Sequence, residues 1–279
     1  MSRLVIEAGK TERAYWSDLW RYRELFFFLS WRDILVRYKQ TVIGVLWALI
    51  RPALTIAIFT VLFGKMAKLP SDGLPYAVFV CAGNLPWQFF ATAMSEASNS
   101  LVANANMLGK IYFPRLVVPA SAVIVAFVDL LISLVILAGL MAWYHVVPTW
   151  RMAALPLFTA LGLGAALGIG FWLAALNVKY RDFRYVIPFI VQFGFFASPV
   201  GFGSSWVFQK LFDVKSGEFL YALYQLNPMV GVIDGFRWAM GGQAGLSWSV
   251  TTSILVVALM VISGLRYFRS TEKTFADII

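Results

Sequence analysis

The sequence predicts an all-α integral membrane protein with six transmembrane helices. Sixty per cent of its 279 residues are hydrophobic and only 13% are charged, whereas a soluble domain has about 45–50% apolar and about 25% charged residues. Several apolar runs approach the ~20 residues that a helix needs to cross ~30 Å of hydrocarbon. These runs predict spans at residues 42–63, 76–98, 117–143, 153–178, 186–202 and 247–267.

The composition also excludes several classes of site. The single cysteine, Cys81, excludes an intramolecular disulfide framework, and no Cys/His cluster has metal-ligand spacing. The chain lacks a phosphate-binding loop and a Ser–His–acid set. The net charge of the chain is +9. In a membrane protein such an excess of Lys and Arg indicates which loops face the cytoplasm and does not indicate binding to nucleic acid. We therefore expect no metal, no catalytic residues and no nucleic-acid partner.

Residues 1–41 are predicted to be a cytoplasmic segment ahead of the transmembrane domain, 42–279. The N-terminus lacks the continuous apolar core of a signal peptide. Apolar residues at helical spacing over 14–29 predict an amphipathic helix that lies at the membrane interface; an ordinary soluble-domain helix is the alternative. Ser30, followed by Asp33, predicts the start of a second short helix. The interface-helix residues are Trp16, Leu19, Trp20 and Phe26.

The first span contains a charge, Arg51, next to a helix breaker, Pro52. A charge near the centre of the bilayer costs at least ~2.5 kcal/mol, so its side chain should face a partner, a cavity or water. Two roles stay open: a structural arginine that pairs with Glu96 or Asp129, and a residue that contacts substrate.

Two further spans carry distinctive residues. The second is predicted to be interrupted around Asn84, Pro86 and Gln88, and such polar breaks survive in a membrane only where protein or a wet cavity covers them. In the fourth span, Gly164 and Gly168 form a GxxxG pair, which permits close helix contact within or between subunits.

Charge counting decides the topology of the segment 219–240. That segment is apolar, yet it contains Asn227, Pro228, Asp234 and Arg237. With six spans, 16 Lys and Arg residues fall in inner segments and six in outer ones. A seventh crossing here would move the basic C-terminus outside, against the positive-inside tendency. We therefore predict an external re-entrant hairpin, cytoplasmic termini and a cytoplasmic segment at 100–119.

Four blocks of sequence, in this order, resemble one known family. They are RDILVRYKQTVIGVLWALIRP at Arg32–Pro52, NMLGKIYFPRLVVP at Asn106–Pro119, NVKYRDFRYVIPF at Asn177–Phe189 with SPV at Ser198–Val200, and LNPMVGVIDGFRWAM at Leu226–Met240. Together they resemble the membrane-spanning permease of type-two ABC exporters, in the subfamily that exports O-antigen and related cell-surface polysaccharides. Arg51 departs from the apolar residue expected there.

The resemblance implies a homodimer in the bacterial inner membrane that pairs with two copies of a cytoplasmic ABC ATPase. ATP and Mg would bind to that ATPase, so no cofactor is expected in this chain. The substrate would be a lipid-linked polysaccharide that passes through a channel at the dimer interface. Segment 221–240 would be an external gate. The residues of the implied coupling helix, which would contact the ATPase, are Asn106, Met107, Lys110, Tyr112, Phe113 and Arg115.

Aromatic side chains can stack on the C–H faces of sugars, which makes several residues candidates for a channel or gate. The alternative for each ring is packing or contact with lipid. The channel or gate candidates are Arg51, Trp87, Phe89, Phe90, Phe193, Phe196, Tyr224 and Asn227.

Basic residues ahead of the first span are candidates for binding a lipid headgroup. Arg32, Arg37 and Lys39 would attract a lipid pyrophosphate at the inner face, and positive-inside anchoring explains them equally well. Two alternatives to polysaccharide export remain: the same fold exporting a capsule, a teichoic-acid-like polymer or a drug, and an intramembrane lipid-modifying enzyme. His145, the single histidine, is expected to be a loop residue.

Overall fold

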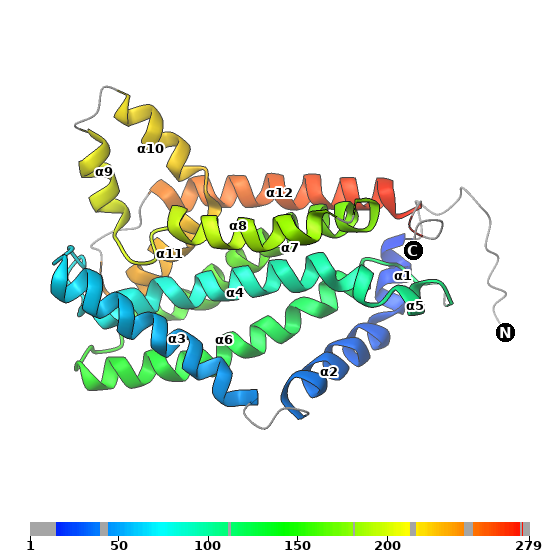
Figure 1. The fold of residues 1–279 in the computed structure, drawn as a ribbon, viewed down its shortest axis with the longest axis horizontal. Coiled ribbons are helices and arrows are strands. Elements are labelled where there is room, and N and C mark those ends of the chain that lie inside the picture. The colour runs from blue at the N-terminus through cyan, green and yellow to red at the C-terminus, as the bar shows by residue number, and fades with distance from the viewer. Residues whose placement is uncertain are drawn as a thin grey trace.

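The computed structural model describes residues 15–39, 44–110, 113–180, 182–212, 216–242, 248–273 and 275. These residues form helices and connecting turns, without any strand in the described part (Figure 1). The helices are α1 (Tyr15–Arg21), α2 (Arg23–Lys39), α3 (Gly44–Phe59), η1 (Thr60–Met66), α4 (Tyr76–Ala103), α5 (Ala105–Leu108), α6 (Val117–Trp143), η2 (Trp150–Ala154), α7 (Leu155–Lys179), α8 (Phe183–Ala197), α9 (Ser204–Phe212), α10 (Gly217–Gln225), α11 (Pro228–Ala239) and α12 (Trp248–Glu272).

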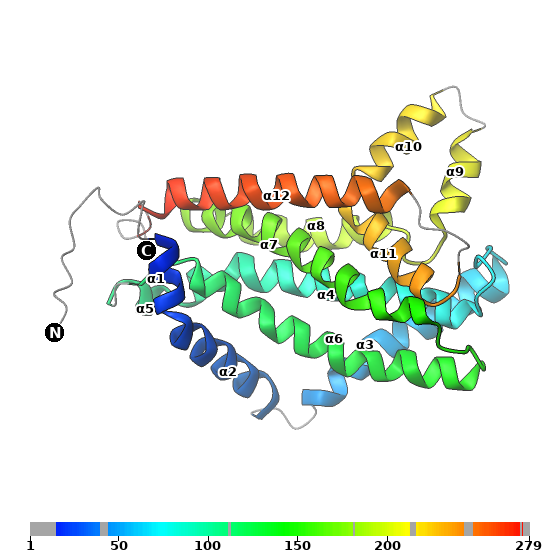
Figure 2. The same ribbon diagram turned by 180° about the vertical axis from the view of Figure 1, so that it is seen from behind.

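The long helices lie alongside one another and form a bundle. Figure 1 shows α1, α5 and the C-terminal end of α12 together at one end of the bundle, which we call the α5 end. Helices α9 and α10 project at the opposite end, the α10 end. The view from behind shows α7 alongside α12 (Figure 2). The two ends of the described chain therefore lie at the same end of the bundle as α5.

Five helical segments are long and apolar enough to cross a membrane, and each overlaps one of the predicted spans. They are Leu46–Met66, Tyr76–Ala103, Val117–Trp143, Trp150–Lys179 and Trp248–Glu272. Residues 42, 43 and 247, where two predicted spans begin, lie outside the described residues.

The fifth predicted span, 186–202, is shorter in the structure than the prediction. Helix α8 has 15 residues and ends at Ala197. Ser198 is extended, with φ −107° and ψ 149°, because Pro199 disfavours the helical conformation of the residue before it. That α8 crosses the membrane, which would bring the number of spans to six, therefore stays a prediction.

Helix α4 is the centre of the bundle. In its apolar window 83% of the residues are buried, against 11–33% in the other four candidate spans. It packs most extensively against α6 and α7. The predicted interruption at residues 84–88 is wrong, since α4 continues through Pro86 for 28 residues. The polar residues there are accommodated by a cavity instead, as described below.

The N-terminal helices differ from the prediction in where they begin and end. A turn at Tyr22 separates α1 from α2, so the predicted helix over 14–29 is divided, and residue 14 lies outside the described part. The predicted helix start at Ser30 is wrong: Ser30 lies inside α2, and its hydroxyl donates to Phe26 O at 2.9 Å, one turn back. Ser30 also reaches the Ser121 carbonyl of α6 at 3.5 Å, and the second half of α2 follows α6.

The glycines of the fourth span make close helix contacts within one subunit, which confirms that prediction. A Cβ built on Gly164 would lie 2.8 Å from Val257 Cγ1, and one on Gly168 would lie 2.9 Å from the carbonyl carbon of Met260. Both neighbours belong to α12. Any larger residue at these positions would push α7 and α12 apart.

The segment 219–240 does not form one continuous helix. It breaks at Asn227 into α10 and α11, and the 12 residues of α11 reach about 18 Å, less than the ~30 Å of the hydrocarbon core. Eleven of those residues are buried, among α4, α7 and α12. The segment therefore supplies no helix able to cross by itself, and a re-entrant path remains a prediction.

Candidate functional site

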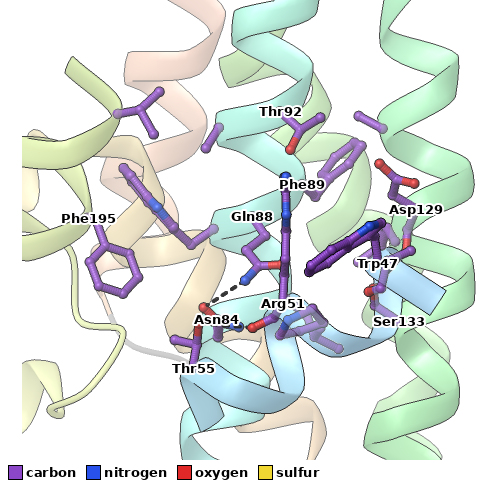
Figure 3. A pocket seen from close by; sticks show the side chains of 18 of the residues that line it. Trp47, Arg51, Thr55, Asn84, Gln88, Phe89, Thr92, Asp129, Ser133 and Phe195 are labelled. Carbon is purple, nitrogen blue, oxygen red and sulfur yellow. Dashed lines mark hydrogen bonds between the residues drawn. The ribbon is translucent and has the colours of Figure 1, made fainter. Parts of the chain in front are cut away.

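A cavity of about 700 Å³ lies between α3, α4, α6 and α8 (Figure 3). On α4 it is lined from Asn84 to Thr92, the middle of that 28-residue helix. Its wall combines aromatic rings with amides, hydroxyls and charges. The principal lining side chains are Trp47, Arg51, Thr55, Asn84, Trp87, Gln88, Phe89, Thr92, Asp129, Ser133, Gln192, Phe195 and Phe196.

The polar face of α4 follows from its spacing. Asn84, Gln88 and Thr92 recur every four residues, which places them on one face of the helix. Gln88 Nε2 donates to Asn84 Oδ1 at 3.5 Å. Asn84 is fully buried, and its Nδ2 has no hydrogen-bond partner in the described structure. An unused donor thus remains at the cavity wall.

The facing stripe of α3 has the same period. Trp47, Arg51 and Thr55 all line the cavity. Pro52 cannot donate to the carbonyl of Ala48, one turn back, and Ser133 of α6 donates to that carbonyl at 3.1 Å instead. This hydrogen bond compensates for the proline and fixes α3 against α6 beside Arg51.

A charged cluster borders the cavity where α2 meets α6. Arg37 pairs with Asp129 at 2.6 Å and with Glu96 at 3.2 Å, and the Tyr38 hydroxyl donates to Asp129. The predicted pairing of Arg51 with Glu96 or Asp129 is therefore wrong, because Arg37 occupies both acids. Arg51 is exposed and forms no salt bridge within the described residues.

The other two headgroup candidates lie apart from the cavity. Arg32 pairs with Asp33 at 2.7 Å and donates to Asn104 Oδ1 at 3.0 Å, so it joins α2 to the end of α4. Lys39 is exposed at the C-terminal end of α2. A role of these residues in binding lipid stays a prediction.

The structure brings only some of the predicted aromatic residues together. Trp87, Phe89 and Phe196 line the cavity. Phe90 is buried and packs on Trp87 with ring centroids 5.4 Å apart, whereas Phe193 is 57% exposed. Sequence reasoning missed Trp47, Thr55 and Thr92, which share the four-residue spacing of Arg51 and Gln88 and were detectable by that period.

The remaining gate candidates belong to the hairpin at the α10 end. Asn227 caps α11 by accepting from the Met229 amide at 3.0 Å, and it donates to Ser198 Oγ at 2.9 Å. Tyr224 is partly buried on α10. Neither residue lines the cavity, so a gate there would act at a distance from it.

Two charged residues anchor this hairpin. Arg237 is fully buried and donates to the carbonyls of Phe79, Val200 and Phe202 at 3.0–3.4 Å; its guanidinium also lies 3.6 Å from the centroid of the Phe79 ring. Asp234 accepts from Ser204 and Ser249 hydroxyls. These bonds connect α11 to α4, to the loop after α8 and to the start of α12.

At the α5 end, the segment predicted to couple to an ATPase has two different faces. Asn106 and Lys110 are exposed and Met107 is half-buried, whereas Phe113 is 4% exposed. The main chain of Arg115 donates to Glu272 Oε1 at 2.8 Å, and its side chain donates to the Glu272 carbonyl. Arg115 thus holds the segment to the C-terminal end of α12, and Phe113 belongs to the apolar cluster that includes Phe268 and Phe275.

Other parts of the coupling prediction concern the short helix itself. Tyr112 lies outside the described residues. Helix α5 ends at Leu108 with Gly109 as its C-cap. Nearby, burial and the carboxylate of Glu272 raise the pKa of the Tyr15 phenol above its ordinary value, so Tyr15 packs there as a neutral group.

Comparison with known proteins shows the family of this chain. The model of the ABC-2 type transporter family matches residues 24–240. The O-antigen export system permease protein RfbA of Myxococcus xanthus is 28% identical over 79% of this chain and 81% of its own length. A Klebsiella pneumoniae protein of the same description is 24% identical over 92% of this chain and 95% of its own.

A relative that is described as transporting a different polymer extends the comparison. The polysialic acid transport protein KpsM of Escherichia coli is 24% identical over 87% of this chain and 91% of its own length. The family match covers well over half of the chain and coincides with the helices that surround the cavity. The chain therefore belongs to the ABC-2 type transporter family, whose members are multi-pass membrane transporters.

Proposed function

We propose that this chain is the permease subunit of an ATP-driven exporter that moves lipid-linked, O-antigen-type polysaccharide across the bacterial inner membrane. The observation that carries the proposal is the cavity at mid-bundle, whose wall combines aromatic rings with amides and hydroxyls. The relatives from Myxococcus xanthus and Klebsiella pneumoniae are described as O-antigen export permeases, which points to the same cargo.

The chemistry of the wall suits a sugar chain. Trp47, Trp87 and Phe89 offer rings that stack on C–H faces, while Gln88 and Thr92 offer hydrogen bonds to hydroxyl groups. Stacking tolerates differences in sugar sequence, which a polymer that slides past the wall requires.

The homodimer of the proposal is supported by the surfaces on either side of the cavity. Large apolar residues are exposed on α3, including Leu54 and Ile58, and on α8, including Phe193 and Phe196. A second copy on these surfaces would complete a channel whose wall is otherwise one-sided. In this arrangement α8 crosses the membrane as the fifth of six spans, and α1 lies at the inner membrane interface with Trp16 and Trp20 exposed.

Energy would come from two copies of a cytoplasmic ABC ATPase that binds ATP and Mg. The exposed side chains of Asn106 and Lys110 support docking at the α5 end, which is cytoplasmic in the proposed topology together with both termini. The hairpin of α10 and α11 would then form the external gate.

A second candidate cargo is an acidic capsule polymer, because the Escherichia coli relative is described as a polysialic acid transport protein. A teichoic-acid-like polymer or a drug has no such support. A lipid-modifying enzyme is less well supported: Glu96 and Asp129 are both paired with Arg37, and His145 lies in the turn after α6.

The proposal is tested by deleting the gene and measuring polysaccharide on the cell surface. We expect the polymer to accumulate inside the cell, and re-expression of the chain together with its ATPase to restore export. Replacing Asn106 and Lys110 by alanine should leave the chain in the membrane but reduce export and uncouple it from ATP hydrolysis. Normal surface polysaccharide after deletion would refute the proposed function.

A further inference from the structure

Among the charged residues that line the cavity, Arg51 is the one without an ion pair to any described residue. The charged lining residues are Arg37, Arg51 and Asp129, and Asp129 accepts a salt bridge from Arg37 at 2.6 Å. Arg51 forms no salt bridge with any residue of the described structure. Arg51, on α3, is therefore the cavity-lining charge that is not held in an ion pair within the described residues.

This charge lies where it is costly. Arg51 lies within the candidate span Leu46–Met66 and lines the cavity opposite the middle of α4, and a charged side chain inside a transmembrane segment marks a functional site by default. Arg51 does not serve the fold through an ion pair, and the Ser133 bond to Ala48 compensates for the neighbouring Pro52. Its guanidinium is available to a ligand.

A second donor points to the same kind of ligand. The Gln88 side-chain amide donates to the carbonyl oxygen of Asn84. The Nδ2 group of Asn84 is buried and has no hydrogen-bond acceptor among the described residues. Figure 3 shows the Arg51 side chain between Gln88 and Trp47, directed into the cavity that Asn84 also lines. The Arg51 guanidinium, which is in no ion pair, and the Asn84 Nδ2 donor, which has no acceptor within the described residues, together favour an anionic ligand at this wall.

We propose that Arg51 and Asn84 bind an anionic group of the transported molecule, a phosphate or a carboxylate. The planar guanidinium matches either group with two parallel hydrogen bonds, and Asn84 Nδ2 supplies a third donor. This inference rests on the proposed function, because it names a chemical feature of the cargo. The group belongs either to the lipid carrier, as a diphosphate, or to the polymer, as an acidic sugar.

The test measures binding to the full chain in nanodiscs of phosphatidylcholine, a lipid without net charge. One pair of probes is geranylgeranyl diphosphate and geranylgeraniol, and the other is a hyaluronan oligosaccharide and a neutral malto-oligosaccharide. We expect the anionic member of at least one pair to bind more tightly to the wild type, and Arg51→Gln to weaken its binding about tenfold. Arg51→Lys should retain part of the difference.

The matched control is Lys65→Gln, which removes one positive charge from the same pass of the chain at an exposed position outside the cavity. It should bind every probe like the wild type. A preference for the diphosphate assigns the group to the lipid carrier, and a preference for hyaluronan assigns it to the polymer. Equal binding of charged and neutral probes, or Arg51→Gln binding like the wild type, overturns the inference.

These outcomes are distinct from those of the export experiment. Polysaccharide export without anion preference would leave the proposed function intact and refute the site at Arg51. If the chain prefers anions but its deletion does not affect surface polysaccharide, the anion site at Arg51 stands and the proposed export function is refuted.

Discussion

The close approach of α7 and α12 at two glycines yields a quantitative prediction. A Cβ built on Gly264 of α12 would lie 2.3 Å from the carbonyl oxygen of Gly168 on α7. Real Cβ contacts under 3.0 Å essentially do not occur. Gly264→Ala therefore requires the two helices to separate locally by about 0.7 Å, the difference between these distances.

The cost of this separation follows from overpacking. Inserting a methyl group into a close-packed contact typically costs about 1–3 kcal/mol, and the better helix propensity of alanine offsets up to about 1 kcal/mol of it. Gly139 of α6 provides the matched control, because a Cβ there would have nothing within 4 Å. Gly139→Ala should therefore gain helix propensity without any cost of overpacking.

The assay is thermal unfolding of the two variants and the wild type in nanodiscs. We expect Gly264→Ala to unfold at a lower temperature than the wild type and Gly139→Ala at the same or a higher temperature. If Gly264→Ala were as stable as Gly139→Ala, the helices would not be in contact at this glycine, and the packing of α12 on α7 described above would be wrong.

Three other predictions concern the ends of the bundle. Arg115→Ala removes the side-chain hydrogen bond to Glu272 and should increase amide hydrogen exchange across α5, whereas Lys273→Ala, at an exposed position, should not. Arg237→Met removes a fully buried cation that binds three carbonyl groups and should lower the unfolding temperature, since each buried acceptor left without a donor costs about 1–3 kcal/mol; unchanged stability would contradict this anchoring role. Cysteines can be placed at Lys68 and Lys273, both of which are exposed. A membrane-impermeant reagent applied outside the cell should label the cysteine at 68 and not the one at 273. Labelling of both would exclude a topology in which the chain crosses the membrane an even number of times.

The hydropathy pattern predicted most of the architecture because spans are a local property of the chain. Helix α6 has the predicted bounds, 117–143, and four further predicted spans correspond to helices of sufficient length. The interruption of α4 was the clearest error. Pro86 and the polar residues around it break a pattern in the sequence, yet neighbouring helices and the cavity accommodate them without breaking the helix.

The sequence indicates which charged residues lie in the spans, but it does not show which of them form ion pairs with one another. The sequence marks Arg51 as a charge in a span and Glu96 and Asp129 as acids in other spans. It does not show that α2 follows α6 far enough for Arg37 to reach both acids. Similarly, the resemblance predicts that Phe113 contacts a partner, and only the fold shows that it is buried in an apolar cluster that includes Phe268 and Phe275.

The sequence alone determined that the chain is a helical membrane protein, where five of its spans lie, and that glycines of the fourth span permit close contact, because length, hydropathy and residue size act locally. Tertiary structure decided which of two arginines the acids neutralise and which aromatic rings share a wall with amides. Those outcomes depend on distances between helices that are remote in sequence. The charge of Arg51 is available to a ligand for that reason, since packing places another arginine closer to both carboxylates.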